Sequence, residues 1–212
     1  MSESTELLNF KLTSLRTSYS GATYYHLAAY HLLTQYLQGF LGKPWGLSLF
    51  LKASQLHLAL FILLHNSFFL ANYLVDLFAV DFPSNKRHRF ILYYSLWIPH
   101  SAFRLFLILP VNLSLVTLSI SALFASAAWL ERECWDMYGI RFLFHRDLRR
   151  LLTDYGFQGH PLRKDFPLVG FSEVRYEESS QSLLLEPVEL SQELRFFSFS
   201  NPWREWSLSN DG

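Results

Sequence analysis

One stretch decides how this chain is organised: WLERECWDMYGIRFLFHRDLRRLLTDYGFQGHPLRKDFPLVG, residues 129–170. Charged residues, aromatics and glycines are interleaved here more densely than elsewhere in the chain. The first part has the three- and four-residue spacing of an amphipathic helix, with Leu130, Cys134 and Met137 on one apolar face. Gly139 follows this pattern, and glycine often ends a helix because it adopts the left-handed conformation without strain. The spacing therefore predicts a helix that stops at Gly139.

The opposite face of this predicted helix carries charge. Arg132 and Asp136 are four residues apart, a spacing at which opposite charges on a helix pair. Beyond the helix, acids and bases alternate, while glycines and prolines interrupt any long helix or strand. Interleaved charges of this kind favour specific contacts with another protein over a continuous track for phosphates. The pattern is typical of an interface.

These residues resemble the signature of the 30-kDa subunit family of respiratory complex I, the NADH:quinone oxidoreductase, which has bacterial and chloroplast members. Looser agreement extends the resemblance to roughly residues 45–205. Two positions depart from the family pattern, Ala128 for a frequent Asn and Arg146 for a frequent Pro. The matching pieces are Glu131-Arg132-Glu133, Asp136, Gly139-Ile140, His145, Asp147-Leu148-Arg149-Arg150, 152–157 and 159–167.

The resemblance implies a non-catalytic structural or assembly subunit of the quinone-reducing module in the peripheral arm of complex I. It implies the 49-kDa subunit as main partner, with the quinone-proximal cluster-bearing subunit nearby and the C-terminal tail extended over the partner. The complex passes electrons from NADH through flavin mononucleotide (FMN) and iron–sulfur clusters to ubiquinone, coupled to proton translocation. These cofactors would belong to partner subunits, so we expect no cofactor, metal or catalytic residue in this chain. The expected interface residues are Glu131, Arg132, Glu133, Asp136, Asp147, Arg149, Arg150, Asp154, Arg163, Lys164 and Asp165.

The composition is apolar and electrically balanced. Half of the 212 residues are hydrophobic, the mean hydropathy is +0.13, and 18 basic residues match 18 acidic ones. This apolar composition is typical of a chain whose surface is partly buried against other proteins in a complex. A formal net charge of zero argues against a general attraction to nucleic acid or anionic lipid.

No transmembrane helix is predicted. The most apolar run, residues 47–65, is interrupted by Lys52, Gln55 and His57, whereas a spanning helix needs about 20 mostly apolar residues. The single Cys134 cannot form an internal disulfide or supply the set of thiolates that an iron–sulfur cluster takes. We expect Cys134 to be buried on the apolar face of its helix.

The N-terminal residues bear on location. Glu3 and Glu6 lie in a stretch that lacks the arginine-rich, acid-poor composition of a transit peptide. Together with the 20 phenylalanines, this suits a mitochondrially encoded subunit on the matrix side of the inner membrane. The cytoplasmic face of a bacterial plasma membrane is the alternative.

Upstream of the signature, the pattern predicts an α+β domain over residues 21–139, after a loose arm at 1–20. Mostly antiparallel strands would form a sheet with helices packed on one face, and residues 140–212 would form the signature loop and a long extended C-terminal tail. Ser54 is placed to cap the second helix. The predicted helices are 22–38, 54–65 and the signature helix, and the predicted strands are 45–51, 73–80, 89–97, 103–109 and 112–120.

Other functions remain as alternatives. Glu131 and Glu133 are two residues apart on a helix and do not face each other, which argues against paired-carboxylate catalysis. His145 and His160 lack cysteine partners and the short spacing of common zinc sites. A related subunit of a membrane-bound hydrogenase, or an RNA- or phosphate-binding module that uses the Arg146–Lys164 loop, stays open.

Overall fold

A computed structural model describes residues 33, 36–43, 46–85, 88–99, 102–111, 116–195 and 197. The predicted arm at 1–20, most of the predicted helix at 22–38 and the last part of the predicted tail lie outside these residues. The chain divides into two compact units, Met1–Phe166 and Pro167–Gly212. The predicted boundary after Gly139 differs from this division.

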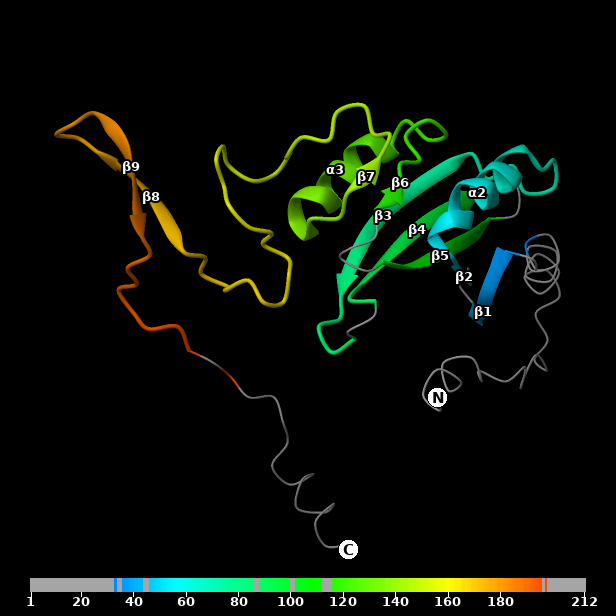
Figure 1. The fold of residues 1–212 in the computed structure, drawn as a ribbon, viewed down its shortest axis with the longest axis horizontal. Coiled ribbons are helices and arrows are strands. Elements are labelled where there is room, and N and C mark those ends of the chain that lie inside the picture. The colour runs from blue at the N-terminus through cyan, green and yellow to red at the C-terminus, as the bar shows by residue number, and fades with distance from the viewer. Residues whose placement is uncertain are drawn as a thin grey trace, which may run out of the picture. The chain divides into compact units, whose positions relative to one another are not determined.

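Unit 1 contains a five-stranded sheet in the order β1-β2-β5-β4-β3 (Figure 1). Only β2 and β5 pair in parallel, and the other neighbours are antiparallel. The prediction of an α+β fold with a mostly antiparallel sheet is confirmed. The strands are β1 (Leu37–Lys43), β2 (Gly46–Leu51), β3 (Tyr73–Asp81), β4 (Phe90–Ile98) and β5 (Phe103–Val111).

One face of the sheet forms the core. Leu92, Tyr94 and Leu96 alternate with half-buried residues along β4, as the two-residue period of a strand requires. Helices α2 (Leu56–His65) and α3 (Ala127–Tyr138) contribute buried residues to the same apolar cluster. Both helices therefore cover this face, which removes its apolar side chains from water.

Three local predictions are wrong in detail. Leu37 and Gln38, expected at the end of a helix, lie in β1, which pairs with β2 as an antiparallel hairpin. Ser54 lies within the 3-10 turn Ala53–Gln55, and no side chain caps α2. Of the strand predicted at 112–120, the described part contains only β6 (Thr117–Leu118), which pairs with β7 (Phe142–Leu143). For β6, the pairing with β7 some 25 positions further along the chain decides the structure, and a local pattern does not reveal such a pairing.

Unit 2 contains a feature that the sequence pattern did not predict. Strands β8 (Ser172–Glu177) and β9 (Ser182–Pro187) form an antiparallel hairpin where an extended tail was expected. Among the helices of the described residues, none has the length and apolar character needed to cross a membrane.

Candidate partner interface

Helix α3 ends where the sequence predicts. Gly139 adopts a φ of 76°, and its backbone N–H donates to the carbonyl of Trp135, 2.8 Å away. This left-handed residue turns the chain back, so that residues 140–166, here called the signature loop, lie against the end of α3. The hydrogen bonds described below hold the loop against the rest of unit 1.

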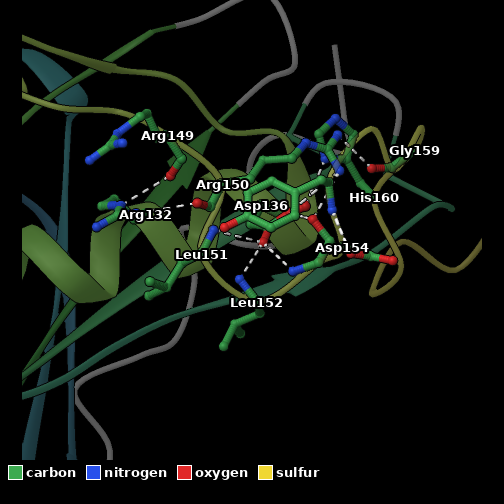
Figure 2. Close-up of polar contacts among 11 residues, drawn as sticks. Arg132, Asp136, Arg149, Arg150, Leu151, Leu152, Asp154, Gly159 and His160 are labelled. Carbon is green, nitrogen blue, oxygen red and sulfur yellow. Dashed lines mark hydrogen bonds and ion pairs between the residues drawn. The ribbon is translucent and has the colours of Figure 1, made fainter.

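The carboxylate of Asp136 organises the middle of the signature loop (Figure 2). Its Oδ2 accepts hydrogen bonds from the backbone N–H groups of Leu151, Leu152 and Thr153 at 3.1, 2.8 and 2.9 Å, and Oδ1 accepts from the Thr153 hydroxyl at 2.7 Å. Burial by itself raises the pKa of Asp136, but these hydrogen bonds outweigh it and lower the pKa below its usual value. Asp136 is therefore an ionised anchor with no exposed surface.

Arg132 does not pair with Asp136 as the helical spacing predicts. Its guanidinium donates to the backbone carbonyls of Arg149 and Arg150 at 3.0 and 3.2 Å (Figure 2). Arg150 takes the place beside Asp136, with Nη1 at 3.5 Å from Oδ1, and its Nη2 donates to the Gly159 carbonyl at 2.8 Å. Arg132 and Asp136, both on α3, thus bind the same loop instead of each other.

The end of the signature loop supplies hydrogen-bond donors to the last carbonyl groups of α3. His160 Nδ1 lies 2.9 Å from the carbonyl of Asp136, and Arg163 Nε donates to the carbonyl of Tyr138 at 2.7 Å. The backbone N–H of Leu162 donates to the carbonyl of Met137 at 3.2 Å. These carbonyls have no partner within the helix, so the loop satisfies acceptors that would otherwise need water.

A second anchor joins the loop to the sheet. Arg89 forms a two-pronged ion pair with Asp81, with distances of 2.8 and 2.9 Å, and its Nη2 also lies 3.0 Å from Asp165. The backbone N–H of Lys164 donates to Asp81 Oδ2 at 2.8 Å. The hydrogen bond from Arg89 lowers the pKa of Asp81. The sequence pattern placed Arg89 at the start of a predicted strand and Asp81 just beyond the end of another, and it gave neither residue a role in the site. The separation of 83 positions between Asp81 and Lys164 hides the contact.

Glu131 lies inside unit 1. Its carboxylate accepts from the Ser119 hydroxyl at 2.6 Å and from the Ile120 N–H at 2.7 Å, and His145 Nε2 lies 3.8 Å away. Burial raises the pKa of Glu131. Neither Glu131 nor Asp136 reaches the surface of this chain, so both have internal roles.

The other predicted interface residues differ in exposure. The Asp147–Arg149 pair, 2.7 Å apart, stands in solvent with side chains 48% and 76% exposed. Exposed apolar side chains occur beside it in the loop, among them Phe144, Leu152 and Tyr155. Half-buried residues are Arg132, Glu133, Arg150 and Arg163, and exposed ones are Asp147, Arg149, Asp154, Lys164 and Asp165.

His145 and Cys134 hold structural positions. Asp147 N–H donates to Nδ1 of His145, whose Nε2 lies 3.1 Å from the Ala128 carbonyl, so the neutral tautomer with a proton on Nε2 satisfies both contacts. Cys134 is buried, and burial raises the pKa of its thiol. In the part of the chain that the structure describes, no group of three or more His, Cys, Asp or Glu side chains could hold a metal ion.

Comparison with known proteins assigns the chain to a family. The sequence profile described as "Respiratory-chain NADH dehydrogenase, 30 Kd subunit" matches residues 49–172. The "NADH dehydrogenase (ubiquinone) iron-sulfur protein 3" of Beta trigyna is 48% identical over 132 residues, which are 62% of this chain and 68% of that protein. An NADH-quinone oxidoreductase subunit from Paramagnetospirillum magneticum is 42% identical over 157 residues, covering 74% of this chain and 78% of its own.

A solved structure shares the fold. It is described as the membrane-bound sulfane sulfur reductase, an archaeal respiratory membrane complex, and matches with a TM-score of 0.57 at 19% identity. The match covers 68% of this chain and 85% of that chain. The sequence matches are far closer, and the profile match includes α3 and the whole signature loop. The chain therefore belongs to the 30-kDa subunit family of the respiratory-chain NADH dehydrogenase.

Proposed function

We propose that this chain is a non-catalytic subunit that docks its neighbours in the quinone-reducing module of proton-pumping NADH:ubiquinone oxidoreductase. Its main partner is the 49-kDa subunit, next to the cluster-bearing subunit that delivers electrons to quinone. FMN and the iron–sulfur clusters belong to partner subunits. Family membership supports a place in this multisubunit complex, and the internal contacts of the signature loop support a docking role.

One observation carries the proposal: the inner side of the signature loop is tied down while its outer side chains are exposed. Asp136, with Arg132 and Arg163, holds the loop backbone against α3. Arg149 and Tyr155 project from the same loop into solvent. A surface that is ordered before binding loses little conformational entropy when a partner docks. Arginine and tyrosine are also residues that carry much of the binding energy in interfaces.

The arrangement of charge favours a protein partner over RNA. Asp147 pairs with Arg149, and Asp136 lies beside Arg150. Arg163 is half-buried and donates to a backbone carbonyl. Phosphate binding depends on arginines and lysines whose charge is available to the nucleic acid. The internal partners of these arginines reduce that availability.

We place the chain on the matrix side of the inner mitochondrial membrane, in the peripheral arm. Relatives whose names refer to ubiquinone come from plants and from Acanthamoeba castellanii, which supports the mitochondrial assignment. The bacterial relative supports the alternative, the cytoplasmic face of a plasma membrane.

The test replaces Arg149 with alanine in the full-length chain. We expect several-fold less assembled complex, on the order of 3- to 10-fold, because an interface arginine is lost. The melting temperature of the isolated chain should change by less than about 1 °C, because an exposed ion pair contributes little to stability. Assembly is measured by native electrophoresis after mild-detergent extraction, and the partners are identified by affinity capture and mass spectrometry.

Two further variants separate docking from folding. Arg104, an exposed arginine on β5, serves as the matched control, and Arg104→Ala should assemble normally. Arg163→Ala should lower both stability and assembly, because Arg163 donates to the carbonyl of Tyr138 inside unit 1. Normal assembly of Arg149→Ala with slower turnover would contradict the proposal.

A further inference from the structure

His145 is a buried histidine whose two ring nitrogens both have polar partners. Its side chain is 3% exposed. Nδ1 accepts from the backbone N–H of Asp147 at 3.1 Å, and Nε2 lies 3.1 Å from the carbonyl of Ala128 in α3. A ring nitrogen accepts a hydrogen bond when it carries no proton, and a carbonyl oxygen needs a donor. The ring is therefore neutral in this arrangement, with its single proton on Nε2.

His145 holds a short segment that lies between two firmer attachments. Upstream, β7 pairs with β6. Downstream, Leu148 packs against the apolar core, and Arg132 donates to the carbonyl of Arg149. Between these attachments, the ring of His145 ties residues 144–147 to α3. The contacts of one ring therefore bear on the conformation of the whole segment.

The backbone of this segment is strained at Phe144. Its φ of 64° is a left-handed conformation that disfavours residues with a Cβ atom. Its side chain is 86% exposed, so packing of the ring offsets little of the strain. A strained residue persists when its surroundings hold it in place. Loss of the His145 contacts would therefore let residues 144–147 relax.

A second proton on the ring is incompatible with this arrangement. Protonated histidine donates from both ring nitrogens. A proton taken from solvent onto Nδ1 would point at the N–H of Asp147, so that two donors face each other. The Asp147 N–H must then move away and donate to water, while Nε2 keeps its contact with the Ala128 carbonyl. Protonation thus breaks the contact that orders the loop side of the ring.

The charged groups around the ring do not remove this conflict. The Glu131 carboxylate of α3 lies 3.8 Å from Nε2, so it attracts a charged ring from the side opposite Nδ1. Tyr94 of β4, which interacts electrostatically with Glu131, is neutral because burial raises the pKa of its hydroxyl. On the loop, the Asp147 carboxylate pairs with Arg149 at 2.7 Å. To accept from Nδ1–H instead, Asp147 has to leave its present position.

We propose that His145 is a proton-operated latch. Its neutral ring holds residues 144–147 against α3, and protonation at Nδ1 releases them. The segment carries Asp147, the partner of Arg149, so the latch controls the order of the exposed surface assigned to docking. This regulatory consequence rests on the proposed function, whereas the latch itself does not.

Amide hydrogen exchange of the full-length chain tests the latch. An unconstrained histidine titrates near pH 6.5, and the closed segment does not take up the second proton. Linkage then raises the open population about tenfold between about pH 7.5 and about pH 5.5. Protection of the Asp147 N–H, measured by NMR and corrected for the intrinsic pH dependence of exchange, should fall by about the same factor. Unchanged protection in the wild type would overturn the inference.

Two histidine variants give a matched comparison. In His145→Asn, a side-chain oxygen that does not titrate can accept from the N–H two residues later, so protection should change less than about twofold over this pH range. His65 is exposed on α2, with Nδ1 3.0 Å from the Phe61 carbonyl, and His65→Asn should keep the tenfold fall. Equal falls in His145→Asn and the wild type would contradict the latch.

Glu131→Gln separates the two titratable groups that lie together. The glutamine keeps an acceptor for the Ile120 N–H and carries no titrating carboxylate. The fall in Asp147 protection should persist in this variant. If Glu131→Gln abolishes the fall, the proton binds at Glu131 and the inference fails.

Nitrogen-15 NMR of the wild type gives an answer even if a variant does not fold. At about pH 7.5 the ring of His145 should show the tautomer with its proton on Nε2. A proton on Nδ1 would overturn the inference, because the Asp147 N–H would then have no acceptor on the ring.

The outcomes separate the latch from the proposed function. The exchange and NMR measurements use the chain without partners, so their failure contradicts the latch and leaves docking untouched. Normal assembly of Arg149→Ala contradicts docking and leaves the latch untouched. If both hold, the wild-type chain should bind its neighbours less well at about pH 5.5 than at about pH 7.5, and His145→Asn should show a smaller difference. Equal differences would contradict the regulatory consequence.

Discussion

The buried carboxylate of Asp136 accepts four hydrogen bonds from residues 151–153. Arg132, one turn earlier in α3, donates to the carbonyls just before that segment. An acceptor and a donor on one helix thus match the donors and acceptors of one loop. Because each backbone group in the contact needs a partner, the loop has little freedom to adopt another conformation.

We predict that Asp136→Ala lowers the free energy of unfolding by about 2–4 kcal/mol, because several donors lose a charged acceptor. Amide hydrogen exchange at residues 151–153 should become faster, which mass spectrometry of labelled peptides measures. Asp154→Ala is the control, since Asp154 is exposed and its carboxylate accepts a hydrogen bond from the N–H of the next residue, Tyr155. Unchanged exchange at 151–153 in Asp136→Ala would rule out the anchoring role.

Glu131 gives a pH-dependent prediction. Burial raises its pKa, so the folded state binds the proton more tightly than the unfolded state does. The ionised carboxylate therefore costs stability above the folded-state pKa, and this cost disappears as the pH falls through that pKa towards the unfolded value. Glu131→Gln, which stays neutral and keeps an acceptor for the Ile120 N–H, should be more stable than the wild type at pH 7, and the difference should vanish near pH 4.

Glu131→Ala supplies the contrast for this prediction. It leaves the Ser119 hydroxyl and the Ile120 N–H without an acceptor and should cost about 2–4 kcal/mol. Denaturant unfolding of the three proteins at several pH values measures both effects. A Gln variant that is less stable than the wild type at neutral pH would show that the charge of Glu131 is needed.

At the scale of elements, α3 and the signature loop meet at Gly139. A Cβ added to Gly139 would collide with the Arg163 guanidinium and lie 2.6 Å from His160 Nε2. Gly156 has the same φ of 76° but has no atom within 4 Å of its added Cβ. The two glycines therefore share the strain of a left-handed alanine and differ only in packing.

We predict that Gly156→Ala costs about 1 kcal/mol, the strain of a left-handed alanine. Gly139→Ala should cost at least about 2 kcal/mol more, because the added methyl group displaces the side chains of His160 and Arg163 from their contacts with the carbonyls of Asp136 and Tyr138. Thermal unfolding of both variants measures the difference. Equal losses would mean that the loop yields to the added methyl group without cost.

The β8–β9 hairpin pairs its two strands but leaves large apolar side chains exposed. Its strands satisfy each other's backbone groups, yet the side chains of Val174, Tyr176, Leu183 and Leu185 are all more than half exposed. A two-stranded hairpin whose large apolar side chains stay exposed is at best marginally stable by itself in water.

At the scale of the whole molecule, the signature loop belongs to the same compact unit as the sheet. The unit extends to Phe166 because Asp81 holds Lys164 and Arg89 holds Asp165. From the sequence, residues 140–212 were expected to form one extended segment, since glycines and prolines leave no long periodic pattern there. The Arg149→Ala test belongs to this scale, because Arg149 projects from a loop whose shape the rest of unit 1 determines.

The sequence by itself determined the family, the α+β class and the end of α3 at Gly139. These features follow from local order along the chain: motif residues, the two-residue period of strands and the 3.6-residue period of helices. The same local reasoning predicted that Arg132 pairs with Asp136. The two residues have the expected spacing on α3, but their side chains bind the signature loop instead of each other.

Only the tertiary structure decided which groups meet. Glu131 is buried and hydrogen-bonded to Ser119. Asp136 accepts hydrogen bonds from the loop, and Asp81 accepts one from Lys164, 83 positions away. A charged residue in the sequence has the same appearance whether it faces a partner, solvent or its own backbone. Its role depends on burial and on the donors brought near it, and these arise only when distant segments pack together.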